Sequence, residues 1–175
     1  MNAVYVYLQL YRLFDNVTPV RGLDCGLLCS KACCKGDGGM YLFPQEEKVF
    51  EFLKPPWLSV EESDFEYTYK NKKKNLKICF CTGKCDRYQR PLACRIFPLT
   101  PYIDKNGNFD IITDPRAKSV CRLAEAYRKD DFNRIFLENV RKTFILLCKN
   151  KEIYEFMKEY SSYLETYMQF FYKNN

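Results

Sequence analysis

Residues 25–34 read Cys-Gly-Leu-Leu-Cys-Ser-Lys-Ala-Cys-Cys, so four of the ten cysteines of the chain fall in one short stretch. Side chains four positions apart share one face of a helix, and a tight turn at Gly26 can bring such thiols together as well. Because thiolates prefer soft or borderline metals, this spacing predicts a metal-binding segment rather than a set of independent buried thiols.

The remaining cysteines form a second group and two isolated positions. Cys79, Cys81 and Cys85 lie close together with Cys94 just behind them, whereas Cys121 and Cys148 stand alone. Cys148 falls in the apolar stripe of an expected helix, where free cysteine packs like a small apolar residue. Cys79 belongs to a strand-like apolar run, and its role as a ligand stays open. The eight predicted metal ligands are Cys25, Cys29, Cys33, Cys34, Cys81, Cys85, Cys94 and Cys121.

The expected cofactor is zinc or an iron–sulfur cluster. Both are held by four sulfurs in common protein sites, and the cysteine spacing does not separate them. Eight sulfurs complete two four-coordinate sites, or one cluster with bystanders. A radical-generating Cys-x3-Cys-x2-Cys motif is absent, because the residue three beyond Cys29 is Ala32 and the residue three beyond Cys33 is Gly36.

Two other interpretations of the cysteines are open. A disulfide framework is typical of small secreted chains, and this chain is neither small nor visibly secreted. The vicinal pair Cys33 and Cys34 is the candidate for a reversible redox switch.

Composition excludes some classes of function. The chain has no histidine, so a histidine-assisted serine or cysteine hydrolase cannot be built within it. The formal net charge is +6 with cysteines counted as neutral. Two four-thiolate centres of charge −2 each would lower it to about +2, so the basic excess offsets the expected site and does not indicate nucleic acid.

Length and composition predict one domain over residues 1–175. Apolar residues make up 47% of the 175 positions, which is ample for a conventional core. We expect a mostly α fold with small β elements, of the α+β class, in which helical N- and C-terminal segments flank an irregular, cysteine-rich metal-binding core. The metal-binding region is expected over about 24–121 and a C-terminal helical pair over about 123–173.

Periodicity and turn residues predict the individual elements. We expect helices over 1–16 and 44–53, and an antiparallel helix pair with a break near Lys149 and Asn150. Strands are expected over 40–43 and 76–80, and a hairpin over 102–112 turning at Asn106-Gly107. Residues 57–77 are interpreted as irregular or weakly stranded, and the lysine-rich run 70–77 as a solvated loop.

The segment from Arg90 to Pro98 reads Arg-Pro-Leu-Ala-Cys-Arg-Ile-Phe-Pro. Together with the cysteines from 25 to 34 and the Cys81-x3-Cys85 pair, it resembles a cysteine-cluster family described as putative zinc- or iron-chelating proteins. That family shows Cys-x2-Cys-x2-Cys-Cys, a glutamate-bearing helix and an Arg-Pro-x2-Cys-Arg-x-Phe-Pro signature. Glu46 and Glu47 hold the helix position here, and the first cysteine spacings are one residue longer. The resemblance implies metal binding by these cysteines, and a similar pattern in flagellin lysine methylases implies one enzymatic alternative.

Three functions are therefore carried forward. The leading hypothesis is a metal-binding protein whose metal folds the 25–121 region, with no catalytic residue assigned. The alternatives are an iron–sulfur enzyme or electron-transfer protein, and a nucleic-acid or protein interaction module that uses the loop 70–77. Arg90 and Arg95 are expected to bind carbonyl oxygens or balance thiolate charge, and Asp37 is a candidate oxygen ligand. We expect no membrane span and cytoplasmic residence. Composition does not favour a nucleic-acid partner, which stays an alternative only, and a protein partner stays open.

Overall fold

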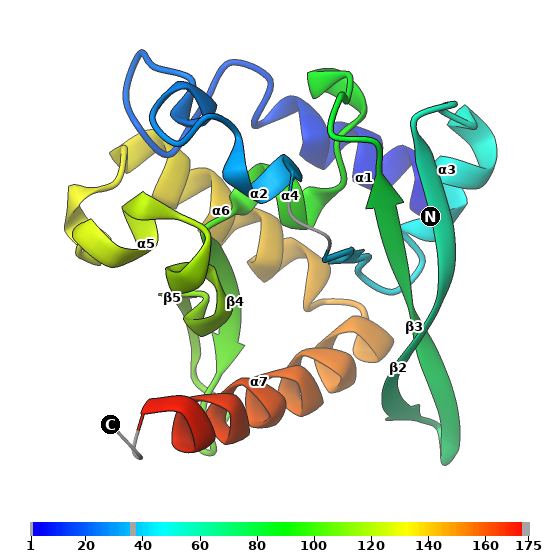
Figure 1. Cartoon of the computed structure of the whole chain (residues 1–175). Helices are drawn as coiled ribbons and strands as arrows, with labels where there is room; N and C mark the ends of the chain where they lie inside the picture. The colour runs from blue at the N-terminus through cyan, green and yellow to red at the C-terminus, as the bar shows by residue number, and fades with distance from the viewer. Residues whose placement is uncertain (1, 36–37, 173–175) are drawn as a thin grey trace.

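The computed structural model, which describes residues 2–35 and 38–172, combines helices with two small antiparallel sheets (Figure 1). With 48% of the residues helical and 21% in strands, the α+β class is confirmed. The α-helices are α1 (Ala3–Arg12), α2 (Ala32–Lys35), α3 (Glu47–Leu53), α4 (Leu92–Ile96), α5 (Arg122–Ala126), α6 (Arg134–Leu147) and α7 (Lys151–Tyr172). The strands are β1 (Met40–Tyr41), β2 (Leu58–Tyr69), β3 (Lys72–Cys81), β4 (Leu99–Ile103) and β5 (Phe109–Thr113). Short 3-10 helices are η1 (Cys25–Leu27), η2 (Arg87–Gln89), η3 (Pro115–Ser119) and η4 (Lys129–Asp131).

The N-terminal helix α1 is shorter than predicted. It begins where the side chain of Asn2 accepts a hydrogen bond from the backbone N–H of Val4, 3.0 Å away, and it ends at Arg12. Its buried stripe consists of Tyr7 with Leu10 and Tyr11, which lie three and four residues after it and therefore share its face of the helix. The expected helix over 44–53 also starts later, at Glu47, and stops at Lys54, whose left-handed backbone caps it before two prolines.

The largest correction concerns residues 57–81, which form a long β-hairpin. Strands β2 and β3 pair from Leu58 opposite Cys81 to Tyr69 opposite Lys72. The two residues between them, Lys70 and Asn71, both have positive φ, which is the geometry of a two-residue hairpin turn. Of the two alternatives for residues 57–77, the stranded one is therefore confirmed and the irregular one is wrong, and the prediction of a loop at 70–77 was wrong as well. Lysines on the exposed face of β3 conceal its alternation, and Lys-Asn is not a usual signature of such a turn.

The lysines of this hairpin are largely neutralised by the protein itself. Lys73 pairs with Glu66 at 2.8 Å and Lys77 pairs with Glu62 at 2.8 Å, both across the two strands. Lys74 reaches Glu152 of α7 at 2.5 Å. These pairs weaken the interpretation of the run as a nucleic-acid surface, because its charge is already balanced at three lysines.

The second hairpin confirms the turn predicted at Asn106-Gly107. Strand β4 pairs with β5 from Leu99 opposite Thr113 to Ile103 opposite Phe109. Gly107 has a φ of +82°, which explains why glycine is required there. The hairpin extends beyond the predicted range 102–112 at both ends, from Leu99 to Thr113.

The two C-terminal helices confirm the predicted break, but they do not pack as an antiparallel pair. After the turn that contains Lys149 and Asn150, α7 diverges from α6 and packs against β2 and β4 (Figure 1). Phe156 of α7 contacts Phe43, Phe65 and Tyr67, with ring centroids 6.1, 6.1 and 5.4 Å apart. The long hairpin, which the sequence did not predict, supplies the surface that α7 covers.

No helix in the described part of the chain is both long enough and apolar enough to cross a bilayer.

Candidate metal centre

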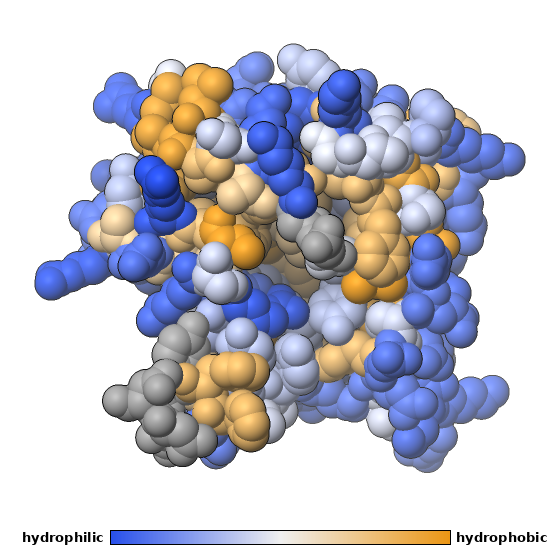
Figure 2. Space-filling model, viewed as in Figure 1, coloured by the Kyte–Doolittle hydropathy of each residue, from blue (hydrophilic) through white to orange (hydrophobic). Residues whose placement is uncertain are grey.

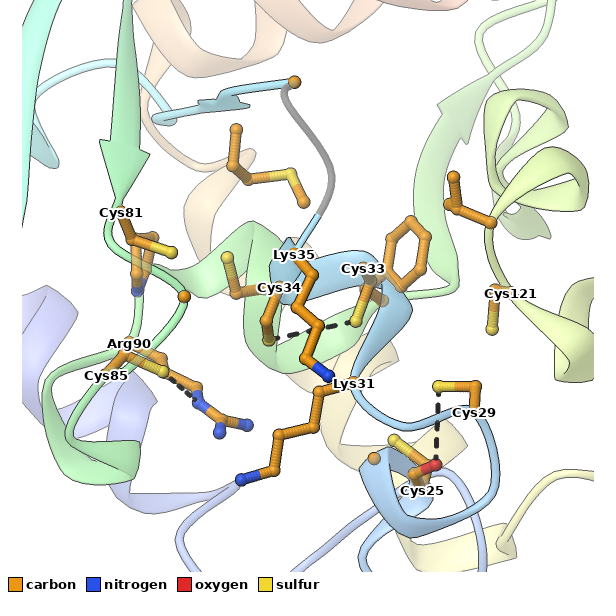
Figure 3. Close-up of a pocket in the computed structure, with 18 of the residues that line it drawn as sticks. Cys25, Cys29, Lys31, Cys33, Cys34, Lys35, Cys81, Cys85, Arg90 and Cys121 are labelled. Carbon is orange, nitrogen blue, oxygen red and sulfur yellow. Dashed lines mark hydrogen bonds between the residues drawn. The ribbon is translucent and has the colours of Figure 1, made fainter.

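Nine of the ten cysteines line one cavity of about 470 Å³. It lies where the segment before α2, the end of β3, helix α4 and the start of α5 meet, and Figure 3 shows thiols from these separate segments around it. All eight predicted ligands take part, and Cys79, whose role was left open, joins them. The lining cysteines are Cys25, Cys29, Cys33, Cys34, Cys79, Cys81, Cys85, Cys94 and Cys121.

Turns rather than one helix bring the first group of cysteines to the cavity. Asp24 caps η1 by accepting a hydrogen bond from the N–H of Gly26, 3.0 Å away. Ser30 and Lys31 then take left-handed backbone conformations, with φ of 51° and 60°. Because this double turn separates η1 from α2, the four-residue spacing does not define a single helical face. Turns bring the thiols to one cavity, as the alternative prediction had it, but in this segment the left-handed residues are Ser30 and Lys31 and not Gly26.

The later cysteines reach the cavity from three elements. Cys81 ends β3, and the chain turns at Gly83, where φ is +79°, before it passes Cys85. Cys94 lies within α4, and Cys121 stands directly before the first residue of α5. Cys148 is the C-cap of α6 and lies apart from the cavity, as expected.

All ten cysteines are free thiols in this structure. The Sγ atoms of the vicinal pair Cys33 and Cys34 are 4.0 Å apart, about twice the length of a disulfide bond. The structure therefore contains no disulfide framework, and the vicinal pair is reduced.

The thiols line the cavity, but their sulfur atoms do not converge on a single point. Within residues 2–35 and 38–172, no three cysteine or carboxylate side chains are placed closely enough to hold a metal ion as they stand. Figure 3 places Cys25, Cys29 and Cys121 on one side and Cys81 and Cys85 on the other, with the vicinal pair between them. Coordination would therefore require the cavity walls to close.

Burial keeps most of these thiols protonated. It raises the pKa of Cys25 to about 11 and, with Cys79 and Cys34 nearby, raises the pKa of Cys94 well above its ordinary range. Its hydrogen bond with Cys34, and then burial, raise the pKa of Cys85. Burial raises the pKa of Cys121 as well. A cation would have to displace these protons, which makes binding of a metal pH-dependent.

Two arginines of the Arg-Pro-x2-Cys-Arg segment have different roles. Nε of Arg90 donates a hydrogen bond to Sγ of Cys85 at 2.9 Å, so this arginine is placed to balance thiolate charge. Arg95 is buried, and its Nε and Nη1 donate to the carbonyl oxygens of Arg90 and Tyr11 at 2.7 and 3.0 Å. The expected binding of carbonyls is therefore confirmed at Arg95, whereas the balancing of thiolate charge by Arg90 stays a prediction.

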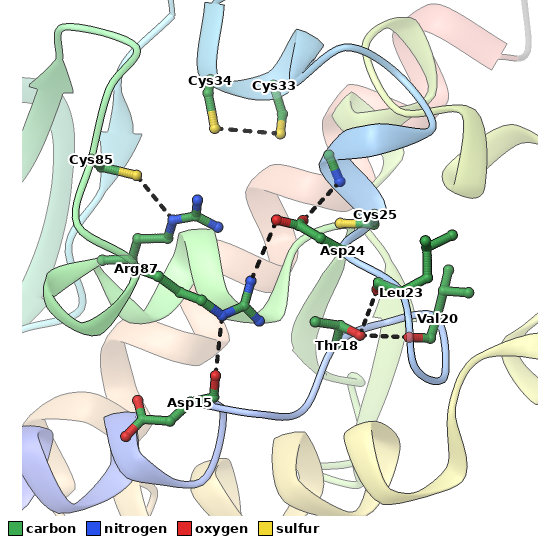
Figure 4. Close-up of polar contacts among 12 residues, drawn as sticks. Asp15, Thr18, Val20, Leu23, Asp24, Cys25, Cys33, Cys34, Cys85 and Arg87 are labelled. Carbon is green, nitrogen blue, oxygen red and sulfur yellow. Dashed lines mark hydrogen bonds and ion pairs between the residues drawn. The ribbon is translucent and has the colours of Figure 1, made fainter.

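Polar contacts tie the two cysteine-bearing segments together behind the cavity (Figure 4). Arg87 lies 4.0 Å from the carboxylate of Asp24, the residue before Cys25, and its Nε donates to the carbonyl oxygen of Asp15 at 3.1 Å. Because Arg87 follows Cys85 by two residues, this contact fixes the second cysteine segment against the first.

Glu46 is the residue whose role the sequence did not define. It is completely buried, and its carboxylate accepts hydrogen bonds from the Tyr11 hydroxyl at 2.5 Å and from the N–H groups of Leu92 at 2.6 Å and Phe43 at 3.0 Å. Leu92 is the first residue of α4, so Glu46 positions the helix that carries Cys94. Burial raises the pKa of Glu46 to about 7. Asp37, the candidate oxygen ligand, lies outside the described residues.

Comparison of the chain with protein-family models, with curated proteins and with solved structures gave no match in any of the three.

Proposed function

We propose that the chain is a metal-binding protein that holds zinc or iron–sulfur centres through its clustered cysteines. The observation that supports this proposal is the cavity of about 470 Å³, where nine free thiols from segments far apart in the sequence gather without forming a disulfide. Free cysteine is usually an isolated, inert core residue, and packing alone gives no reason for nine of them to share one cavity.

The eight expected ligands divide into two sets of four. The first set is Cys25, Cys29, Cys33 and Cys121, and the second set is Cys34, Cys81, Cys85 and Cys94. The proposed division follows the thiols that raise one another's pKa: Cys121 and Cys29 raise that of Cys25, whereas Cys79, Cys34, Cys81 and Cys85 raise that of Cys94. Cys33 lies between the two sets, since Cys29, Cys25 and Cys94 all act on its pKa. The vicinal pair would then give one sulfur to each centre.

This donor set fits zinc and iron–sulfur clusters equally. Four thiolates close the coordination of a structural zinc ion and also hold a common iron–sulfur cluster. Bound zinc would supply folding free energy, and a cluster would add electron transfer. The Arg90 guanidinium beside Cys85 lowers the cost of gathering thiolates, since it places a positive charge next to one of them. The resemblance of the cysteine segments to the zinc- or iron-chelating family supports the same proposal.

The test is anaerobic purification followed by elemental analysis and a visible spectrum. Two bound zinc ions and no colour identify zinc centres, whereas iron, sulfide and absorption near about 400 nm identify clusters. We expect Cys29→Ser and Cys85→Ser each to lower the metal content by about half, because each removes one ligand from a different set. Cys148→Ser is the matched control and should keep the full content. Protein that carries no metal, or equal loss in all three variants, would reject the proposal.

A further inference from the structure

A second cavity, of about 400 Å³, adjoins the cysteine cavity. The two share part of their walls, including Cys33, Met40, Phe97 and Val120. The second cavity lies between β1, α4, β4, η3 and α7, and the space-filling view shows a hollow near the centre of this face, close to where α2, α4 and β1 meet (Figure 2). Its volume falls in the range of about 300–1,000 Å³ that small-molecule sites occupy.

The wall of this cavity is mostly apolar, with polar groups gathered on one part of it. Leu42, Ile96 and Leu99 contribute aliphatic surface, and Phe43 and Phe156 contribute ring surface. The polar groups come from η3, β4 and α7, and they are Thr100, Asp114, Arg116 and Tyr160. An apolar body with one polar end is therefore the ligand shape that the walls complement.

The guanidinium of Arg116 is held rigidly at this polar end. Its Nε and Nη2 donate to the two carboxylate oxygens of Asp114 at 2.9 and 2.6 Å, and Nη2 also donates to the hydroxyl of Tyr160. The rings of Tyr41 and Tyr163 lie 5.8 and 5.9 Å from its central carbon. Because the side chain is already ordered, a ligand that binds to it loses little free energy in immobilising it.

Two donors remain on this guanidinium. Its hydrogen bonds to the described residues use Nε and Nη2, so both N–H groups of Nη1 are left for an acceptor. The carboxylate of Asp114 already balances the charge of Arg116, and the side chain of Asp114 is only 7% exposed. The polar end therefore favours an uncharged acceptor such as a carbonyl over a full anion.

We propose that this cavity binds a small, uncharged organic molecule with an apolar body and one carbonyl acceptor directed at Arg116. The opposite part of the ligand would lie beside Cys33, on the wall shared with the cysteine cavity. Binding itself does not require the metal, so this inference goes beyond the proposed function and can be tested separately from it.

The test uses the solvatochromic ketone 6-propionyl-2-(dimethylamino)naphthalene, which is planar, uncharged and carries a single carbonyl group. It is titrated into the anaerobically purified protein with its bound metal, and binding is followed by the blue shift of its emission. We expect one saturable site per chain. Absence of saturable binding overturns the proposal.

Substitutions that fill the second cavity from two of its walls test whether the probe binds there. Ala93 of α4 and Ala32 of α2 line the second cavity and not the first, so Ala93→Leu and Ala32→Leu should each raise the Kd of the probe at least about tenfold. Ala126→Leu on the exposed face of α5 is the matched control and should bind within about twofold of wild type. An unchanged Kd in both filling variants, or equal weakening in the control, overturns the proposal.

Two comparisons complete the experiment. The anionic dye 1-anilinonaphthalene-8-sulfonate should bind more weakly than the ketone, and tighter binding of the anion would overturn the uncharged class of ligand. Metal content is measured on the same samples. Metal-loaded protein without a ketone site rejects only this inference, whereas metal-free protein that still binds the ketone rejects only the proposed function.

Discussion

The carboxylate of Glu46 accepts a hydrogen bond from the backbone N–H of Leu92, 2.6 Å away, across 46 residues of sequence. Leu92 opens α4, whose early N–H groups have no partner within the helix. The buried side chain of Glu46 therefore caps the N-terminus of the helix that carries Cys94, a predicted metal ligand. The adjacent residue, Pro91, makes no such hydrogen bond.

Replacing this carboxylate is expected to destabilise the fold. Glu46→Ala leaves three buried donors without their acceptor, since Tyr11, Phe43 and Leu92 all donate to Glu46. We expect the free energy of unfolding at pH 5 to fall by about 4 kcal/mol, measured by denaturant titration. Glu51→Ala, on the exposed face of α3, should change it by less than about 0.5 kcal/mol. Equal effects of the two variants would show that the carboxylate is not needed.

The same residue predicts a pH dependence. Burial raises the pKa of Glu46 from 4.5 to about 7, so its contribution to stability is complete below pH 4.5 and declines as the pH rises through 7. The difference in unfolding free energy between wild type and Glu46→Ala should therefore shrink by up to about 3 kcal/mol between pH 5 and pH 8. Denaturant titrations of both proteins at several pH values measure it. A difference that grows with pH contradicts the raised pKa.

The sequence predicted the residues of the cysteine cavity better than their positions. The close spacing of the cysteines in the sequence was enough to name eight that line the cavity. Few roles other than metal binding explain so many thiols close together in a chain of this size. The backbone path was harder to predict, since the left-handed turn at Ser30 and Lys31 carries no glycine. Cys79 illustrates the remaining gap: it is an apolar strand residue and a cavity-lining thiol at the same time.

Tertiary contacts account for what the sequence missed in the fold. The hairpin turn at 104–108 contains a glycine with positive φ, Gly107, and this turn was predicted. The turn at Lys70 and Asn71 also has positive φ at both residues, but it contains no glycine and was not predicted. The packing direction of α7 depends on the surface that β2 and β4 present to it, and no pattern within α7 encodes that surface. Glu46 was predictable as a helix-start residue but not as the partner of α4.

The aromatic core predicts a large effect at Phe144. This side chain is fully buried, and its ring centroid lies 4.9 Å from that of Phe43. Phe144→Ala should lower the free energy of unfolding by about 4 kcal/mol, because it removes apolar contacts and leaves a cavity. The adjacent Ile145 is 50% exposed, and Ile145→Ala should cost less than about 1 kcal/mol. Similar losses at both positions, measured by thermal or denaturant unfolding, would contradict this packing.

The ion pair between Asp114 and Arg116 predicts that substitutions at these two residues have non-additive effects on the free energy of unfolding. Arg116→Ala leaves the buried carboxylate of Asp114 without its cation and should cost about 3 kcal/mol. Adding Asp114→Asn should restore at least about half of that loss, because the uncompensated charge is then removed. Arg134 pairs with Glu138 at an exposed site, and Arg134→Ala should cost less than about 0.5 kcal/mol. Additive effects of the Asp114 and Arg116 substitutions in denaturant titrations would argue against coupling.

Removal of the metal is expected to loosen the cysteine region and spare the C-terminal helices. The only tryptophan, Trp57, lines the cysteine cavity, so its emission should shift to longer wavelength when the walls separate. Helices α6 and α7 contact β5, β2 and β4 instead, and their hydrogen-exchange protection and the ellipticity at 222 nm should persist. Protection should be lost at 24–35 and 82–94, since the proposed metal supplies folding free energy there.

Cys148→Ser provides the matched control for metal removal, because Cys148 lies outside the cavity. Chelator-treated samples of this variant should behave as treated wild type, and untreated samples as untreated wild type. Elemental analysis establishes complete removal in each case. If Trp57 emission and the protection of 24–35 stay unchanged in fully metal-free protein, the cavity is formed by packing alone and its thiols do not organise the fold through a cation.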